Sequence, residues 1–255
     1  MGWFDNVRMW FAKSTLAVAS SQLVPPILSV SPEGWLTPTS PTVLHMPSSR
    51  TTALEVPAPL GLVWHWTGGP ALGPAYATAL AAEILRFNRL TDRPASWHVL
   101  VAKNGRLIQS VPFTLGAWHV GRSGTIGGHP LYNINAGSIG VELENAGRLE
   151  KLNGEFYCAP YWHKQGNHLV PDPRWRIPAE RAVLRGTTWL DSFPPAQIEA
   201  AEKLVRALVA RFSWKREACA YEHRKIDPSR REDPGELWSQ VVLPVLLDRV
   251  FKMER

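Results

Sequence analysis

The chain has 255 residues, a formal net charge of +6 at pH 7 and a hydrophobic content of 45%. These values are typical of a single globular domain with a sizeable core, and no segment approaches the length of a membrane-spanning helix. The positive charge favours an anionic partner. The sequence contains neither a basic recognition helix nor an aromatic ribonucleoprotein motif, so binding to nucleic acid is not predicted.

The first part of the chain, residues 1–59, is predicted to be an N-terminal arm and linker. Residues 14–30 are apolar but interrupted by Ser20-Ser21-Gln22 and Pro25-Pro26, which makes a poor secretory signal. Residues 31–59 are rich in Pro, Ser and Thr, a composition typical of an extended linker. Residues 1–30 fit a short amphipathic helix docked on the domain, a membrane-surface segment or a weak export signal, and we favour the docked helix.

The rest of the chain, residues 60–255, is predicted to be the domain itself. Its first strand is expected at 62–64, after which Gly68-Gly69 ends the apolar run. Asn104-Gly105 predicts a two-residue hairpin turn. The other expected elements are strands over 97–102, 106–111 and 138–144, and helices over 74–90, 195–212 and 236–251, the last kinked at Pro244. This order predicts an α/β fold with a mixed central β-sheet flanked by helices.

A substrate groove is expected beside this sheet. Residues 145–190 are rich in Pro, Trp and Arg, and we expect them to form an irregular insertion that is a wall of the groove. The chain has 12 tryptophans. Indole rings stack on sugars as well as filling cores, and Trp66 and Trp118 are the best candidates to line the groove.

Three residues have the character of metal ligands. His223 and Asp233 are ten residues apart, too far for one helix face, and Pro228 and Pro234-Gly235 supply the turns that would bring them together. A catalytic zinc site needs three such ligands and an open position for water. His65, at the end of the first strand, is the candidate third ligand, with a core histidine packed among tryptophans as the alternative.

Four blocks of sequence resemble a known family in the family's own order. They are Val63–Thr67, then Ser96–Val101 with Asn104-Gly105 and Ala117–Gly121, then Asn135 with Ser138–Glu144, and last His223–Gly235. Together they are similar to the zinc-dependent N-acetylmuramoyl-L-alanine amidases of the amidase-2 type. This family includes phage lysozyme-type amidases, bacterial anhydro-muropeptide amidases and peptidoglycan recognition proteins. The resemblance runs from about residue 60 to about residue 238.

The resemblance implies a set of reacting groups. Zn²⁺ would be held by His65, His223 and Asp233, and Glu142, rather than Glu144 on the same strand face, would be the general base. Many catalytic members carry Lys two residues before the Asp ligand, where this chain has Arg231. The arginine keeps the charge that would stabilise an oxyanion, although its planar fork has a different reach.

The resemblance also implies how substrate is bound and which branch of the family is closest in type. The expected substrate-binding residues are His119, Trp66, Trp118 and Asn135. Asp233 as third ligand resembles the anhydro-muropeptide branch, because many phage-type and recognition members have Cys there. The expected partner is peptidoglycan or a muropeptide, and the protein is expected to be a monomer.

The function expected is hydrolysis of the amide between N-acetylmuramic acid and L-alanine. The basic charge and the 145–190 insertion favour a phage endolysin acting on polymeric wall, present in the host cytoplasm and then at the wall. A cytoplasmic amidase that recycles anhydro-muropeptides, an exported enzyme, a non-catalytic peptidoglycan-binding module and a regulatory protein are the alternatives.

The remaining titratable side chains carry smaller expectations. Cys158 and Cys219 leave a disulfide open, since one pair in a chain of this length is no disulfide framework. Cys219 is a weak alternative ligand because it precedes His223 by four residues. His98 is expected to be a structural histidine on its strand.

Overall fold

The computed structural model describes residues 28–37, 42–69, 95–158, 162–165, 168–171 and 175–252. The helix predicted over 74–90 and most of the predicted N-terminal helix lie outside the described residues. Among the described helices, none is long and apolar enough to cross a membrane.

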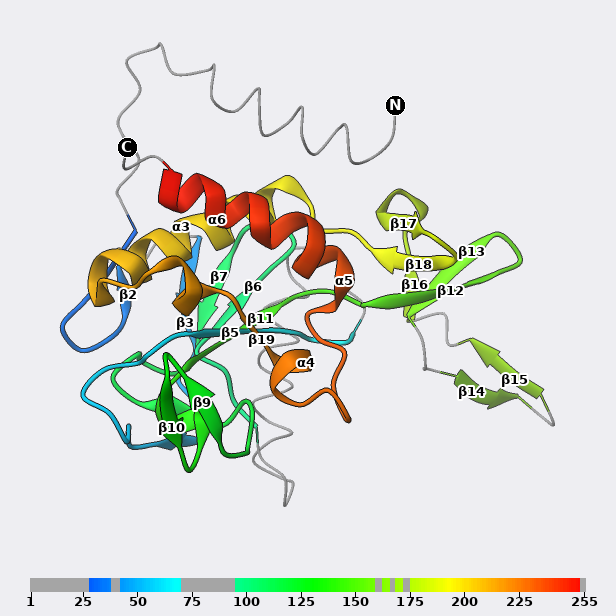
Figure 1. The fold of residues 1–255 in the computed structure, drawn as a ribbon. Coiled ribbons are helices and arrows are strands. Elements are labelled where there is room, and N and C mark those ends of the chain that lie inside the picture. Colours follow the sequence, from blue (N-terminus) through cyan, green and yellow to red (C-terminus); the bar gives the residue numbers. More distant parts are fainter. Residues whose placement is uncertain are drawn as a thin grey trace, which may run out of the picture.

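A six-stranded mixed sheet forms the centre of the fold (Figure 1). In spatial order its strands are β19 (Tyr221–Glu222), β5 (Leu62–Trp66), β11 (Ile139–Leu143), β6 (Val99–Val101), β7 (Leu107–Gln109) and β3 (Val43–His45). The β6–β7 hairpin is antiparallel, as Asn104-Gly105 predicts, and the other neighbouring strands are parallel. The predicted mixed α/β sheet is confirmed.

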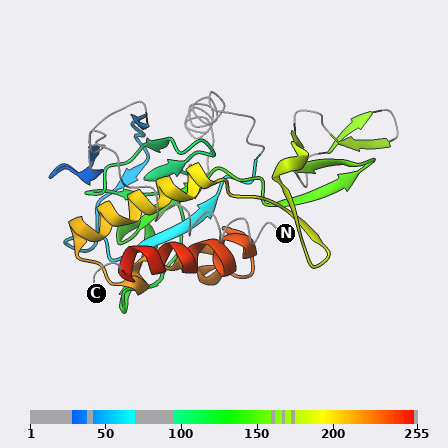
Figure 2. The same cartoon turned by 90° about the horizontal axis from the view of Figure 1, so that it is seen from above.

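Two long helical segments lie side by side over one face of this sheet (Figures 1 and 2). Helix α3 (Pro195–Phe212) has the predicted bounds. The helix predicted over 236–251 forms as α5 (Gly235–Leu237), the π-helical η5 (Trp238–Val242) and α6 (Leu243–Lys252). The π-helical stretch lies directly before Pro244, which has no N–H for a regular helical bond.

The face of each strand decides what it contacts. Trp64, Val141 and their alternate neighbours pack with α3 and α6 in the main core. Because side chains alternate along a strand, His65 and Glu142 point to the opposite face. That face is covered by loops that carry β8 (Gly116–Ala117), β9 (Gly124–Ile126), β10 (His129–Leu131) and the short helix η1 (Ile134–Ala136).

Part of the segment expected to be a linker is folded onto the domain. β3 extends the central sheet beside β7, and β4 (Thr51–Thr52) pairs with β8. A small ribbon of β1 (Ser29–Val30) and β2 (Leu36–Thr37) precedes them. Leu36 and Val43 are buried in the main core, and this burial stabilises the segment where its Pro and Ser content predicted an extended linker.

Residues 145–190 are also more regular than predicted. They form an antiparallel sheet, here called the accessory sheet, with the order β16 (Arg176–Ile177), β13 (Glu155–Cys158), β12 (Arg148–Leu152), β18 (Thr188–Asp191) and β17 (Ala182–Arg185). Nearby lie the hairpin β14 (Trp162–Gln165) and β15 (His168–Pro171), and the short helix η3 (Ala179–Arg181). The expectation of irregular structure is wrong because Leu149, Phe156 and Ile177 form their own small core.

A turn signal inside the accessory sheet explains its first hairpin. Leu152 pairs with Glu155, so Asn153 and Gly154 alone form the turn. Both residues have positive φ, 50° and 83°, the backbone that a type I′ turn requires. Asn-Gly is the dipeptide that best adopts this turn, and it stands between segments that alternate in polarity. The hairpin was therefore predictable from this dipeptide.

Candidate metal centre and active site

The structure brings the three predicted metal ligands together on the loop-covered face of the sheet. One nitrogen or oxygen atom from each of His65, His223 and Asp233 lies within 4.8 Å of the others, and all three residues are buried. Nδ1 of His65 and Nδ1 of His223 lie 3.1 Å and 2.9 Å from the same Asp233 oxygen, Oδ2. The spacing of ten residues between the last two is therefore closed by a turn, as predicted.

The backbone positions each of these side chains. β19 pairs in parallel with β5, with Glu222 opposite Trp64, so the next residues, His223 and His65, emerge side by side. His223 begins α4 (His223–Ile226), and the Arg224 N–H donates to the Asp233 carbonyl across the loop. Between them the carboxylate of Asp227 is buried and receives Arg122 at 2.8 Å and Arg230. These ion pairs connect the segment from His223 to Asp233, here called the ligand loop, to the segment after His119.

The protonation states suit metal binding. Burial alone would raise the pKa of Asp233, but hydrogen bonds from His223 and His65 outweigh it and hold that pKa well below the usual range. Burial lowers the pKa of His65 despite the nearby Asp233. A metal ligand must be a neutral imidazole or an ionised carboxylate, and these shifts favour those forms.

The donor set also fits a tetrahedral ion in size. Bonds of about 2.0–2.1 Å at tetrahedral angles place neighbouring ligand atoms roughly 3.3 Å apart. The two measured separations of 3.1 and 2.9 Å are close to this spacing. Two imidazole nitrogens and one carboxylate oxygen are a donor set used by catalytic zinc. The three residues present can hold such an ion.

Glu142 lies beside these three residues, and one of its carboxylate oxygens has no hydrogen-bond partner among the described residues. It is the direct register partner of His65 on the neighbouring strand. This carboxylate oxygen is Oε2, which is buried. Burial raises the pKa of Glu142 well above its usual value, the charge of Asp233 adds to this and the charge of Arg231 opposes it. Glu144 is different, because its Oε2 accepts the Lys103 N–H at 2.7 Å.

The charge of Arg231 influences the candidate metal centre. Its positive charge acts on both His65 and Glu142, lowering the pKa of each. In the described part of the chain, no ion pair or side-chain hydrogen bond engages its guanidinium, and the residue is exposed. The guanidinium is therefore available to a ligand at the metal centre.

Comparison with known protein families identifies the family of this chain. The sequence profile of Amidase_2, described as N-acetylmuramoyl-L-alanine amidase, matches residues 55–236. The chain belongs to this family.

Individual relatives agree with the family profile. N-acetylmuramoyl-L-alanine amidase AmiD of Escherichia coli K12 is 34% identical over 161 residues, which are 60% of this chain and 45% of AmiD. The chain thus spans less than half the length of that relative. Among solved structures, a selenomethionine derivative of AmpD has a TM-score of 0.51 at 22% identity, covering 84% of this chain and 97% of AmpD. A complex of E. coli AmiD with the substrate anhydro-N-acetylmuramic acid-L-Ala-D-gamma-Glu-L-Lys has a TM-score of 0.46 at 27% identity, covering 86% and 65%.

Within this amidase-family chain, His119, a predicted substrate contact, lies against the predicted ligand His65. Its Nδ1 lies 3.0 Å from Nε2 of His65, and its Nε2 lies 3.3 Å from the Ser138 hydroxyl. A Cβ placed on Gly140 would lie 2.5 Å from the His119 ring, so this position needs glycine. Both ring nitrogens of His119 therefore have hydrogen-bond partners, and the contact with Nε2 orients the ring of the predicted ligand His65.

Asn135, also a predicted substrate contact, is held against a loop backbone. The side chain is buried, and its Oδ1 accepts the backbone N–H groups of His119, Val120 and Gly121 at 3.0, 2.7 and 3.4 Å. It therefore shapes the loop that carries His119. The sequence block marked the residue, but its partners are the backbone of a loop 14 to 16 residues earlier, which no local pattern indicates.

The two predicted groove tryptophans lie in different places. Trp66 lines a cavity of about 430 Å³ between the accessory sheet and the ligand loop. Its ring packs against Gly147 and Gly235, where an added Cβ would lie 2.8 and 2.3 Å away. Trp118 does not line this cavity; it is partly buried, with the Arg50 guanidinium 5.9 Å from its ring centre.

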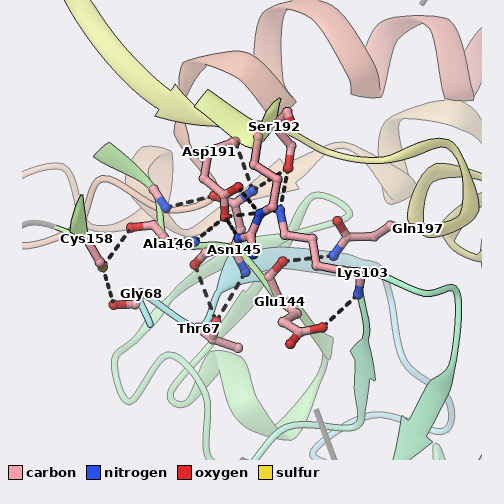
Figure 3. A network of polar contacts seen from close by, with 12 residues as sticks. Thr67, Gly68, Lys103, Glu144, Asn145, Ala146, Cys158, Asp191, Ser192 and Gln197 are labelled. Atoms are coloured by element: carbon pink, nitrogen blue, oxygen red, sulfur yellow. Dashed lines mark hydrogen bonds and ion pairs between the residues drawn. The ribbon is translucent and has the colours of Figure 1, made fainter. Parts of the chain in front are cut away.

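A buried polar network joins the accessory sheet to the end of β11 (Figure 3). The carboxylate of Asp191 receives Arg181 through two hydrogen bonds of 3.0 and 2.6 Å, the Ala146 N–H at 2.8 Å and the Lys103 ammonium at 3.1 Å. Asn145 donates to the Asp191 carbonyl at 3.0 Å. No local sequence pattern predicts this network, because its members come from four separate segments.

The cysteines take no part in the candidate centre. Cys158 and Cys219 are both free and buried, so neither the disulfide nor the Cys219 ligand alternative is supported. Burial raises the pKa of each thiol to about 12. Both are therefore inert thiols at neutral pH.

Replacing His119 by alanine is expected to weaken metal binding about 10- to 100-fold, the usual cost of losing a residue that orients a ligand. With a metal bound at Nδ1, the Nε2–H of His65 would donate to Nδ1 of His119, 3.0 Å away. Asparagine can place an oxygen near the position of Nδ1, so His119→Asn should retain more affinity than His119→Ala. Competition with a chromogenic chelator measures this. Equal affinities in wild type and both variants would contradict the supporting role.

His98 is expected to make stability depend on pH. Its Nδ1 accepts the Gly140 N–H at 3.0 Å and its Nε2 donates to the Leu115 carbonyl at 2.9 Å, the structural position predicted. Burial lowers the pKa of His98 from 6.5 to about 4, although the Leu115 bond opposes this. The neutral form stabilises the fold above pH 6.5, and about 3 kcal/mol should be lost as pH falls towards 4.

Urea unfolding of metal-free protein between pH 7 and 4 measures this loss. His98→Gln should be less stable at pH 7 and should show a shallower decline over this range than wild type. Parallel declines in the two proteins would assign the pH dependence to other groups.

Proposed function

We propose that this chain is a zinc-dependent N-acetylmuramoyl-L-alanine amidase that hydrolyses the amide between N-acetylmuramic acid and L-alanine in peptidoglycan. The observation that carries the proposal is the convergence of His65, His223 and Asp233 on one point, with the unpartnered carboxylate oxygen of Glu142 beside it. Zinc is proposed because two imidazoles and one carboxylate leave an open fourth position.

The residues of the chain would divide the chemistry as follows. Zinc bound by the three ligands would polarise the scissile carbonyl and lower the pKa of water from 15.7 towards about 7. Glu142 would accept the proton of the attacking water and pass it to the leaving amine of L-alanine. Arg231 would donate hydrogen bonds to the oxyanion, a contribution commonly worth about 3 kcal/mol per donor.

The raised pKa of Glu142 suits this double role. A general base works best when its pKa lies near the operating pH, since it must both accept and release a proton. Burial and Asp233 raise the pKa, and Arg231 limits the rise. A non-catalytic binding module has no need of such a carboxylate, and its presence beside three complete ligands favours an enzyme.

The same reaction could act on either of two natural substrates, polymeric wall or soluble anhydro-muropeptides. We propose polymeric wall, as for an endolysin, on the basis of the net charge of +6. Asp233 in the third ligand position supports the alternative of soluble anhydro-muropeptides. Mass spectrometry of products from intact sacculi and from anhydro-muropeptides, digested at equal enzyme concentration, decides between them. Faster release from the soluble substrate would reject the lysin role.

Removal of metal is expected to abolish hydrolysis. Dialysis against a strong chelator should eliminate release of stem peptide from the wall, and one equivalent of zinc should restore it. In the proposed mechanism, zinc lowers the pKa of the attacking water, and no other group of the site replaces it in this role. Magnesium added at the same concentration is the control and should restore nothing, since it prefers oxygen ligands. Full activity after exhaustive chelation would refute the zinc mechanism.

A further inference from the structure

The cavity beside the metal centre is strongly basic. Its volume is about 430 Å³, and it lies between the accessory sheet and the ligand loop. Five basic side chains and two acidic ones line it: Arg148, Arg185, Arg224, Lys225 and Arg231, against Glu232 and Glu236. A concave site with an excess of positive charge concentrates anionic ligands. The predicted groove residue Trp66 and part of the predicted groove wall over 145–190 line this cavity, but no local pattern indicates that Arg148 and Arg185 meet the ligand loop there.

The cavity shares Arg231 with the surroundings of the proposed reaction centre, although neither the three proposed ligands nor Glu142 lines it. Arg231 lines the cavity, and its charge acts on both His65 and Glu142. Trp66 and Glu232, which also line it, are the chain neighbours of the proposed ligands His65 and Asp233. A stem peptide that extends from the metal centre past Arg231 would therefore reach this cavity.

The walls of the cavity are held in place before any ligand binds. Thr188 and Leu190 line it from β18, and Asp191 at the end of that strand is fixed by the buried network of Figure 3. The same carboxylate holds the Ala146 N–H, two residues before Arg148. The network thus ties the cavity wall to the end of β11, the strand that carries Glu142, which favours a preformed binding site.

The positive charges of the cavity are only partly neutralised. Arg224 and Lys225 lie 2.8 and 2.6 Å from one carboxylate, the buried Glu222, so two cations share one anion. Arg148 pairs with Glu232 at 3.2 Å, and both side chains are more than half exposed. An exposed pair of this kind is worth little, about 0–1 kcal/mol, so a ligand can displace Glu232 from Arg148.

We propose that this cavity binds a carboxylate of the stem peptide on the L-alanine side of the scissile amide; this inference rests on the proposed function. A D-glutamyl residue linked through its γ-carboxyl keeps a free α-carboxylate, and the last residue of the stem keeps another. Arginine forms paired hydrogen bonds with carboxylates. Arg148 is then a specificity residue, and Glu232 is a competitor for it that the substrate replaces.

Substrates that differ by one charge test the inference. The parent compound is N-acetylmuramoyl-L-Ala-D-γ-Glu-L-Lys, and the two analogues carry an amide at the glutamate α-carboxyl or at the lysine carboxyl. In Arg148→Gln, kcat/KM for the parent should fall about tenfold, mainly through KM, the size expected for loss of one charge-assisted hydrogen bond. Glu232→Gln should have the opposite effect, because it frees Arg148.

A matched control separates this effect from a general loss of surface charge. Arg176 is also an exposed arginine of the accessory sheet paired with a glutamate, Glu155 at 2.8 Å, but it does not line the cavity. Arg176→Gln should leave all three substrates unchanged. The analogue for which Arg148→Gln has no effect identifies the carboxylate that is bound. Equal losses on all three substrates, or a fall in kcat/KM with Glu232→Gln, would overturn the proposal.

Failure of the proposed function can be told apart from failure of this inference. If zinc-loaded wild type hydrolyses none of the three compounds, the amidase proposal fails. Titration calorimetry with the same compounds then tests the cavity alone. Tighter binding of the parent than of one amide, lost in Arg148→Gln and kept in Arg176→Gln, supports the site, and equal affinities refute it.

Discussion

Glu142→Gln is expected to retain bound zinc and to lose turnover by about 100-fold or more, the usual contribution of a general base. Glutamine has nearly the same shape but cannot accept the proton of the attacking water. The proposed ligands His65, His223 and Asp233 are unchanged, so metal content should stay at one equivalent. Elemental analysis of the purified variant and kcat on a soluble muropeptide measure the two quantities.

The control for this variant is a glutamate outside the site. Glu150 lies on β12 of the accessory sheet and lines neither the metal centre nor the cavity. Glu150→Gln should match wild type in both metal content and kcat. If Glu142→Gln turned over substrate as fast as Glu150→Gln, Glu142 would lose its assigned role. Loss of zinc from Glu142→Gln would instead indicate that Glu142 is a metal ligand.

Asp191→Ala is expected to destabilise the fold by about 3–5 kcal/mol, the cost of removing one partner from a buried ion pair. Lys103 and Arg181 would remain buried without their carboxylate, and the Ala146 N–H would lose its acceptor. Burial already lowers the pKa of Lys103 to about 8, with Asp191 opposing the shift. Partial loss of the Lys103 proton in the variant would relieve some of the cost. Urea unfolding at pH 7 measures the change.

Asp248 supplies the matched control for that prediction. Its carboxylate also pairs with two cations, Arg216 at 2.9 Å and Lys252 at 2.5 Å, but the side chain is exposed. Asp248→Ala should cost no more than about 1 kcal/mol, as is usual for surface pairs. Similar losses in both variants would mean that burial of the Asp191 network adds nothing to its strength.

The elements that sequence predicted well are those with strong local patterns. Helix α3 has an apolar stripe over five turns, and its bounds were predicted to the residue. The Asn104-Gly105 turn fixed the β6–β7 hairpin, and the apolar run before His65 gave β5. The ligand residues could be proposed because histidine and aspartate are zinc ligands and because the sequence blocks that contain them resemble the amidase-2 family.

Other features depended on contacts that no local pattern reveals. Asn135 and His119 are predicted to bind substrate, and the structure in addition places the first against a loop backbone and the second against His65. The basic cavity arises from residues on the accessory sheet and on a loop tens of positions away. Asn153-Gly154 is a hairpin signal of the same kind, which the prediction of an irregular segment, based on Pro, Trp and Arg content, did not use.

The order in which the chain is made has a consequence for the metal centre. His65 and Asp233 are separated by 168 positions, and His223 reaches His65 only when β19 joins the edge of the sheet beside β5. A growing chain therefore holds one of its three proposed ligands for most of its synthesis. Under the proposed mechanism the complete ligand set forms in a single late step, so incomplete chains and chains cut before Asp233 would lack one or two of the three proposed ligands.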